Sequence, residues 1–307
     1  MLSITIMQHL LIIGASGVLG HAAAIHFLEK GYKVTAFVRD KNKATDLLQS
    51  GAEIIEGDIT DPSGIKNIFK DIDVVLTAVH GMLGRGKNSS ENLDGRAHMQ
   101  LIDEARRAGV KHFIYTSIAG AGPDSLFDFS RTKYTVEQHL IKSGLGYTIL
   151  RPAAFMEWHA YRLLGKGIID KGKASILGKG ETPMNFVAIK DVVGTIDKVI
   201  TSDEYINTIL TLAGPQNFTR NEVANMFGKA TGKPFTVRHL PIGVVKLLSN
   251  IFQPFHPGIA RIMKMTLLTE GVDQSMPASD TVKRFGLEPT TMESFISHII
   301  GEDVKKV

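Results

Sequence analysis

Short apolar runs alternate with amphipathic segments along the first two thirds of the chain. Residues 10–13 are Leu-Leu-Ile-Ile, a pattern typical of a strand buried on both faces of a parallel sheet. Helix-forming residues follow from Ala22 to Glu29. Further strands are predicted over residues 32–38, 52–55, 73–79, 110–117, 147–151 and 208–212, and helices between them include 92–108 and 132–142. Strands that alternate with helices predict an α/β fold with a doubly wound parallel sheet.

A glycine-rich turn joins the first strand to the first helix. Gly14, Gly17 and Gly20 recur at every third position. Such a turn lets the backbone approach a ligand, and it opens a helix whose free N–H groups and positive dipole end favour a pyrophosphate. A tight turn without a nucleotide is the alternative, but the strand-helix order favours a dinucleotide site of the Rossmann type. The predicted cofactor contacts here are Gly14, Ala15, Ser16, Gly17, Val18, Leu19 and Gly20.

The end of the second strand bears on the choice of cofactor. A ribose 2′-hydroxyl is usually bound by an acidic side chain at this point, whereas a 2′-phosphate needs a cation. Arg39 follows the strand, and Lys43 lies four residues further on. A guanidinium binds phosphate through two parallel hydrogen bonds. NADP(H) is therefore favoured over NAD(H), although Asp40 either caps the next helix or pairs with Arg39, and a solvated Arg39 is the alternative.

The tips of the next two strands add further predicted contacts, because the carboxyl ends of parallel strands face the ligand crevice. Asp58 follows the third strand and is expected to accept a hydrogen bond from the adenine amine, with Ile59 covering the ring. A helix-capping role is the alternative for Asp58. At the tip of the fourth strand, Ala78, Val79 and His80 are predicted to line the cofactor from the other side.

Two motifs resemble a known group of proteins. The Gly-x-x-Gly-x-x-Gly spacing resembles the atypical and extended short-chain dehydrogenases/reductases. Residues 133–156 read Lys-Tyr-x-x-Glu-x-x-Leu-x-x-Ser-Gly-Leu-x-Tyr-Thr-Ile-Leu-Arg-Pro-x-x-Phe-Met and are similar to NmrA-like NAD(P)H-binding proteins. The resemblance spans roughly residues 8–235. It implies a bound NAD(P)H and adds Pro152 and Phe155 to the cofactor contacts.

The resemblance also implies where catalysis takes place. Short-chain reductases use a Tyr and a Lys four residues later on one helix face. Phe129 stands in place of that Tyr, Lys133 is retained, and Tyr134 points about 100° away around the helix. Ser117 matches the serine that polarises the substrate. Lys133 and Ser117 are therefore the catalytic candidates, with Lys133 also binding the nicotinamide ribose; an ion pair of Lys133 with Glu137 is the alternative.

Two classes of function follow from these residues. The first is an NADPH-dependent oxidoreductase of the atypical short-chain type that acts on a small carbonyl, enone or quinone, with Lys133, Ser117 or water supplying the proton. The second is a non-catalytic NADP(H)-binding redox sensor or assembly factor, which Phe129 supports because its ring has no proton to give. A nucleotide-sugar epimerase is a weaker third class, since its usual Tyr base is missing.

No clean linker divides the chain, so we predict a single NAD(P)-binding fold over residues 1–307 with a smaller C-terminal substrate lobe. The predicted Rossmann core is 7–151 and 184–215, and the predicted substrate lobe is 152–183 and 216–307.

Three local predictions complete the organisation of the chain. Asp191 is expected to cap the helix before the strand at 208–212, and the glycine-rich loop 81–92 is expected to be a mobile lid. Residues 240–268 are rich in large apolar side chains and predict core helices or the roof of an apolar pocket. A membrane-surface helix is the alternative, because three cations accompany the apolar residues. These cations are Lys246, Arg261 and Lys264.

Composition narrows the remaining function classes. The chain has no Cys, which removes thiolate catalysis, disulfides and cysteine metal sites. A formal charge of +4 without a long basic block argues against nucleic acid as a partner. His21 and His26 share little of one helix face, so no metal site is expected. We expect a cytoplasmic protein without a transmembrane segment, a monomer or homodimer that binds an apolar or quinone-like small molecule.

Overall fold

A computed structural model describes residues 8–278, 282 and 284–304 of the 307-residue chain. These residues form two compact units. The first unit consists of residues up to Arg151 together with Val193–Leu210, and the second of Pro152–Val192 with the residues from Thr211 onward. The predicted core boundary at Met7 lies outside the described residues.

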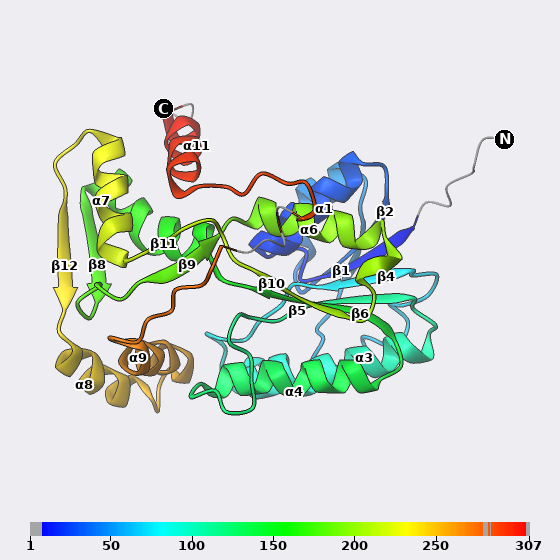
Figure 1. The fold of residues 1–307 in the computed structure, drawn as a ribbon. Coiled ribbons are helices and arrows are strands. Elements are labelled where there is room, and N and C mark those ends of the chain that lie inside the picture. The colour runs from blue at the N-terminus through cyan, green and yellow to red at the C-terminus, as the bar shows by residue number, and fades with distance from the viewer. Residues whose placement is uncertain (1–7, 279–281, 283, 305–307) are drawn as a thin grey trace. The chain divides into compact units, whose positions relative to one another are not determined.

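The first unit is built on a seven-stranded sheet with the order β10-β6-β5-β4-β1-β2-β3 (Figure 1). All neighbours from β6 to β3 pair in parallel. The strand order moves outward from β1 in both directions, so the predicted doubly wound parallel sheet is confirmed. The strands are β1 His9–Ile13, β2 Lys33–Val38, β3 Glu53–Glu56, β4 Val74–Thr77, β5 His112–Thr116, β6 Gly146–Pro152 and β10 Thr208–Leu212.

Helices cover both faces of this sheet, with α1 over one face and α3 and α4 over the other (Figure 1). The predicted helix over 92–108 begins as a π-helix, η3, and continues as α3. The predicted helix over 132–142 begins earlier, at Asp128, whose Oδ1 accepts a hydrogen bond from the Phe129 N–H at 2.8 Å. Phe129 and Lys133 therefore lie on one helix. The helical segments are α1 Val18–Glu29, η1 Lys41–Ala44, α2 Thr45–Gln49, η2 Gly86–Asn88, η3 Glu91–Ala97, α3 His98–Arg107, α4 Asp128–Lys142, α6 Ile189–Ile200 and η5 Asp203–Tyr205.

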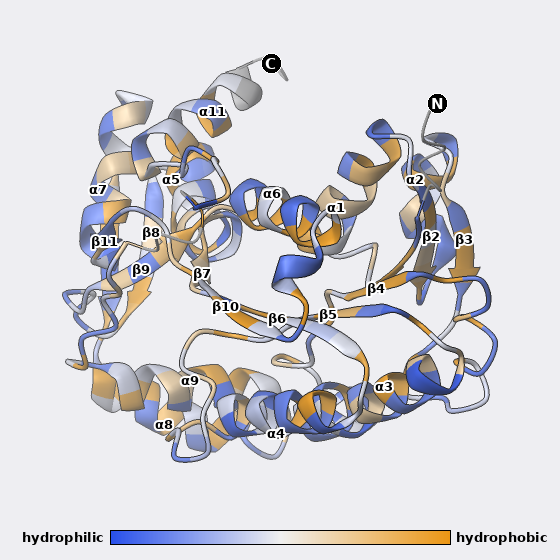
Figure 2. Ribbon diagram, turned by 45° about the vertical axis from the view of Figure 1, so that its right-hand side comes forward, coloured by the Kyte–Doolittle hydropathy of each residue, from blue (hydrophilic) through white to orange (hydrophobic). Residues whose placement is uncertain are grey.

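The strands of the sheet are buried because both of their faces carry apolar side chains. Residues 10–13 of β1 are each 0% exposed, and burial of such a side chain contributes roughly 1.5–3 kcal/mol. Figure 2 shows hydrophobic colouring along β4. Against this apolar background, Asp94, His98 and Lys133 are 0%, 0% and 2% exposed. Charged and titratable groups at this depth need partners, because an unpaired buried charge is costly.

The second unit contains two small sheets, β11-β9-β7 and β12-β8, with helices around them. Its apolar core includes Phe186, Phe227 and Met292. No helix among the described residues has the length and apolar character needed to cross a membrane. The strands are β7 Ala154–Phe155, β8 Lys173–Leu177, β9 Met184–Val187, β11 Asn217–Phe218 and β12 Thr236–Leu240. The helices are η4 Met156–Gly165, α5 Lys166–Lys171, α7 Arg220–Thr231, α8 Ile242–Phe252, α9 Pro257–Thr269 and α11 Met292–Val304.

The amino end of α6 is bound differently from the sequence prediction. The Ile189 N–H donates to Glu157 Oε1 at 2.9 Å, so Glu157 serves this helix end. Asp191 accepts instead from the Thr290 N–H at 2.8 Å and from Thr290 Oγ1 at 2.7 Å. Asp191 was expected to cap α6, and its carboxylate joins α6 to the segment before α11. Burial raises the pKa of Glu157 to about 7.

Candidate functional site

The glycine turn presents its backbone to solvent at the start of α1. Gly14 has a φ of +87°, a left-handed conformation that side-chain-bearing residues rarely adopt. Ser16, Gly17 and Val18 are exposed, Val18 by 60%. Gly17 is the N-cap of α1, and no side chain of the described residues caps this helix end. The first-turn N–H groups are therefore available to an anion. The buried side chains of the turn are those of Ala15 and Leu19.

The three glycines have different steric roles. A Cβ at Gly14 would lie 2.5 Å from Val79 Cγ2, and a Cβ at Gly20 would lie 2.3 Å from the Gly14 carbonyl oxygen. The packing of the turn therefore requires both glycines. A Cβ at Gly17 would lie 3.2 Å from that same oxygen and 3.8 Å from the Ala78 oxygen, with no other such contact in the described chain. A purely structural turn thus explains Gly14 and Gly20 better than it explains Gly17.

The cations predicted for the 2′-phosphate lie just beyond β2. Arg39 and Lys43 are both exposed, Arg39 after the end of the strand and Lys43 in η1. Asp40 Oδ1 accepts a hydrogen bond from the Asn42 N–H at 3.0 Å and caps η1. The carboxylate is therefore engaged with the backbone of η1, which leaves Arg39 and Lys43, with the exposed Lys41 between them, as cations at this strand end that are suited to a phosphate.

The tip of β3 carries a carboxylate that already has partners. Asp58 Oδ1 accepts from Thr60 N at 3.0 Å and Thr60 Oγ1 at 2.8 Å, and Oδ2 lies 3.0 Å from Lys87 Nζ. Burial opposes ionisation of Asp58, but these hydrogen bonds and Lys87 lower its pKa. Ile59 is 4% exposed and belongs to the apolar core, which leaves little of its side chain to cover an adenine ring.

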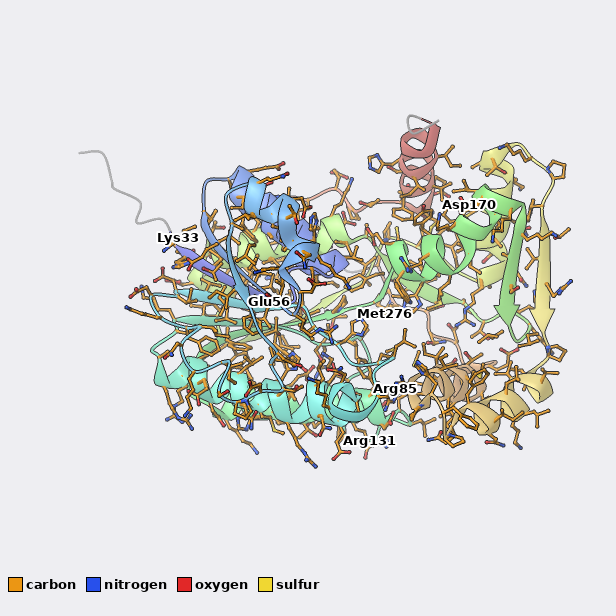
Figure 3. The ribbon with its side chains drawn as sticks, turned by 180° about the vertical axis from the view of Figure 1, so that it is seen from behind. Lys33, Glu56, Arg85, Arg131, Asp170 and Met276 are labelled. Carbon is orange, nitrogen blue, oxygen red and sulfur yellow. The ribbon has the colours of Figure 1, made fainter. Side chains whose placement is uncertain are left out.

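The ends of β2 and β3 both lie at the carboxyl end of the parallel sheet. Figure 3 labels Glu56, the last residue of β3, and Arg85 in the loop after β4, whereas Lys33 marks the amino end of β2 on the opposite side. The parallel pairing of β1, β2, β3 and β4 places the glycine turn on the same side as Glu56. The residues predicted to contact the adenosine half of the cofactor therefore lie at the carboxyl end of the sheet.

The tip of β4 is tied to a buried carboxylate. Ala78 and Val79 are half-buried and His80 is exposed. Desolvation of the His80 ring lowers its pKa, Lys133 lowers it further, and the Asp94 carboxylate opposes the shift. The Gly81 N–H donates to Asp94 Oδ2 at 2.8 Å. Asp94 therefore fixes the backbone just after the predicted cofactor contacts.

The other oxygen of Asp94 faces Lys133. Lys133 Nζ lies 3.3 Å from Asp94 Oδ1 and donates to the Thr116 carbonyl oxygen at 3.2 Å. It also lies 5.0 Å from the centroid of the Tyr115 ring and 5.7 Å from that of Phe129. A buried ammonium needs such compensation, because an unpaired buried charge costs several kcal/mol. The lysine is thus held in place by groups from three segments of the first unit.

The alternative prediction, an ion pair of Lys133 with Glu137, is wrong. Glu137 is 0% exposed and pairs with Arg151, whose Nε lies 3.0 Å from Glu137 Oε1. Glu137 therefore serves β6, and Lys133 is a buried residue with its own carboxylate instead of a surface partner of Glu137. Tyr134 is half-buried one position further along α4.

Hydroxyl groups without partners surround the end of β5. Ser117 is 2% exposed, and its Oγ has no hydrogen-bond partner within the described part of the chain. The same holds for Oγ1 of Thr116 and of Thr77. Buried hydroxyls are usually hydrogen-bonded, so several orphaned ones at the carboxyl end of the sheet suit polar atoms of a ligand. Ser117 follows Thr116, whose carbonyl binds Lys133, so the two catalytic candidates are brought together.

Besides Asp94, two titratable residues outside the predicted site, His98 and Tyr115, complete the cluster. His98 Nδ1 lies 2.7 Å from the Leu93 carbonyl oxygen, and its ring meets that of Tyr115 edge-on. Burial, aided by Lys133, lowers the pKa of His98 to about 4, so this ring is neutral near pH 7. Burial raises the pKa of Tyr115 well above its usual range, with Asp94 contributing. Asp94 and His98 lie four residues apart on an otherwise apolar helix face, which is the sequence signal that could have revealed them.

Two predicted contacts fall outside this cluster. Pro152 and Phe155 belong to the second unit, at the end of β6 and in β7. Their predicted contact with the cofactor stays a prediction.

The residues present fit a dinucleotide. The fit rests on an uncapped helix end beside Gly17, exposed cations at Arg39 and Lys43, and orphaned hydroxyls at the tip of β5 beside Lys133. These features follow the phosphate-to-nicotinamide order in which a Rossmann sheet binds its cofactor. No group of three His, Cys, Asp or Glu side chains suited to a metal ion occurs among the described residues.

Comparison with known proteins gives relatives along nearly the whole chain. Photosystem II assembly factor Ycf39 of Synechocystis sp. is 25% identical over 310 residues, which cover 98% of this chain and 93% of that protein. NAD(P)H azoreductase of Xenophilus azovorans is 27% identical over 233 residues, covering 76% of this chain and 77% of the relative.

Solved structures share the fold. Citrobacter sp. triphenylmethane reductase complexed with NADP(H) superposes with a TM-score of 0.75 at 21% identity, covering 94% of this chain and 99% of that one. The NADPH-dependent quinone oxidoreductase of Escherichia coli gives a TM-score of 0.72 at 22% identity, covering 95% and 99%. A family profile for NAD(P)H-binding proteins matches residues 14–178, more than half of the sequence. The chain therefore belongs to the NAD(P)H-binding family, as its sequence motifs predicted.

Proposed function

We propose that this protein is an NADPH-dependent reductase that acts on a small apolar acceptor, a carbonyl, enone or quinone. The observation that carries the proposal is the buried Lys133, paired with Asp94 and hydrogen-bonded to the Thr116 carbonyl beside the orphaned Ser117 hydroxyl. A lysine is rarely buried to 2% exposure unless it is paired, so Lys133 is not an ordinary surface cation. Cofactor binding and proton donation would account for its burial.

NADPH is favoured over NADH for an electrostatic reason. Arg39 and Lys43 are exposed at the end of β2, and the Asp40 carboxylate is occupied by the backbone of η1. A 2′-phosphate placed here would meet two cations, whereas a 2′-hydroxyl would lack its usual acidic partner.

When bound, NADPH supplies a hydride to the acceptor. In this proposal Ser117 Oγ orients the acceptor oxygen, and the Lys133 ammonium binds the ribose and delivers the proton directly or through water. Asp94 keeps the ammonium in place and at the same time holds the Gly81 backbone. Phe129 cannot donate a proton, and the face of its ring instead packs against the Lys133 ammonium.

The class of acceptor is supported by the relatives. One is named an NAD(P)H azoreductase, and two of the similar folds are a quinone oxidoreductase and a triphenylmethane reductase. Those names favour an aromatic or quinone-like acceptor for this chain as well.

A second candidate function, that of a non-catalytic assembly factor or redox sensor, has two observations in its favour. Phe129 replaces the usual proton donor, and a relative spanning 98% of the chain is named as an assembly factor. In that case NADP(H) occupancy would alter the affinity for a partner protein, and no acceptor would be reduced.

NADPH consumption in the presence of a panel of quinones, enones and aldehydes separates the two. The reductase proposal expects acceptor-dependent oxidation of NADPH, faster than that of NADH. Tight NADPH binding in calorimetry combined with no turnover on the whole panel would favour the assembly or sensor function.

A further inference from the structure

The helical hairpin formed by α8 and α9 carries an exposed apolar face. Val244, Leu247 and Ile251 on α8 are 39%, 60% and 50% exposed, and Phe255 just beyond the helix is 71% exposed. Spacings of three and four residues place the three α8 side chains on one face. Figure 2 shows hydrophobic colouring interspersed along both helices. Large apolar side chains scattered singly need no explanation, but a contiguous row of them on one element indicates an interaction surface.

The opposite face of α8 is already satisfied. Val245 and Ser249 are 0% and 1% exposed, and Ser249 Oγ donates to the Lys246 carbonyl oxygen at 3.1 Å. Helix α8 thus buries the face that carries Val245 and Ser249, and its apolar side chains on the other face are exposed to solvent. The sequence prediction of core helices describes the face that carries Val245 and Ser249 and leaves the exposed face unexplained.

The charge around this face is one-sided. Residues 223–269 contain six Lys and Arg residues and no Asp or Glu, so the formal charge of this stretch is larger than the +4 of the whole chain. Lys246 lies one position from Leu247 on the exposed side of α8. Lys264 of α9 is exposed, and its Nζ donates to Gln253 Oε1 at 2.8 Å, close to Phe255. Cations therefore flank the apolar row.

We propose that the α8–α9 hairpin docks on the surface of an anionic lipid bilayer. Apolar side chains flanked by cations, on a stretch of residues 223–269 without Asp or Glu, match a bilayer whose headgroups are negative and whose acyl boundary lies beneath them. The long lysine stems reach headgroups while the apolar row enters the boundary. A second copy of the chain fits poorly, because two such cationic faces would repel each other. The docking is peripheral, since no described helix can cross a membrane.

Vesicle co-sedimentation of the full chain tests the proposal. One set of vesicles contains phosphatidylcholine with about 30% phosphatidylglycerol, and the other is pure phosphatidylcholine. We expect binding to the first set, weakened by high salt, and little binding to the second. Replacing Lys246 and Lys264 by Gln should weaken binding by about fivefold per cation removed. Leu247→Glu with Ile251→Glu should abolish it.

The matched control is Leu48→Glu on α2, where a leucine of similar exposure, 58%, lies far from the hairpin in sequence. It should bind vesicles as the unchanged protein does. Circular dichroism and NADPH binding establish that each variant is folded. Equal binding to both vesicle types, no binding to either, or unchanged binding by the Leu247→Glu, Ile251→Glu variant would overturn the proposal. Light scattering adds one contrary outcome, a dimer that the same double substitution breaks without any effect of lipid.

Discussion

Replacing Asp94 by asparagine should destabilise the first unit strongly although it alters few atoms. The amide oxygen of the new side chain would still accept the Gly81 hydrogen bond, but Lys133 would keep its ammonium at 2% exposure without a counter-charge. Removing one partner of a buried ion pair costs about 3–5 kcal/mol, because the remaining charge is uncompensated. Lys133→Met should cost a similar amount by leaving the Asp94 carboxylate alone. Combining both changes removes both charges, so the double variant should be more stable than either single one.

Urea unfolding followed by far-ultraviolet circular dichroism measures these differences. The single tryptophan of the chain, Trp158, lies in the second unit, so its fluorescence reports that unit separately. Lys111→Met is the matched control, because Lys111 pairs with Asp73 at 2.8 Å but is 78% exposed, and such surface pairs contribute under about 1 kcal/mol. Single variants that each cost less than about 1 kcal/mol, or costs that simply add in the double variant, would refute this account of the buried pair.

Three further predictions concern the glycine turn, the cofactor preference and the pH dependence of stability. Gly17→Val should abolish NADPH binding in calorimetry while circular dichroism stays unchanged, whereas Gly20→Val should unfold the turn, since its Cβ would lie 2.3 Å from the Gly14 oxygen; normal NADPH binding by folded Gly17→Val would contradict this. Arg39→Ala should weaken NADPH by about 1.5–3 kcal/mol and leave NADH nearly unchanged, and equal losses in titrations of both cofactors would argue against the assignment. Glu157 has a pKa raised by burial from 4.5 to about 7, so its contribution to stability is complete below about pH 4.5 and is lost as the pH rises toward 7; Glu157→Gln should flatten that part of the stability profile in thermal melts, and an unchanged slope would count against the shift.

The fold was predictable because its signals are local. Four aliphatic residues in a row identified β1, and the strand at 208–212 was predicted with the bounds that the structure has. The edges of the other strands moved by one or two residues, as for the strand predicted at 110–117, which the structure has as His112–Thr116. The start of α1 moved by four residues, from Ala22 to Val18. The start of α4 moved from 132 to Asp128, because a side-chain hydrogen bond in the first turn adds to the helix there.

The cluster at Lys133 was predictable only in part. The motif selected Lys133 and Ser117, but the partner of the lysine comes from a segment distant in sequence, and no local spacing encodes such a pair. The four-residue rule pointed to Glu137, which pairs with Arg151 instead. Tertiary packing decided between two carboxylates of equal chemistry. Asp94 could have been selected only by asking why a helix face that is otherwise apolar carries an acid.

The most direct test of the central claim compares Lys133→Met with the unchanged protein in one assay, using the best acceptor from the NADPH panel. We expect kcat to fall by about 10²–10⁴-fold, the usual contribution of a positioned proton donor. The NADPH dissociation constant should rise by only about fivefold, for one lost ribose hydrogen bond. The Asp94→Asn, Lys133→Met double variant supplies a folded background for the same measurement. An unchanged kcat for Lys133→Met would place the chemistry elsewhere and contradict the assignment.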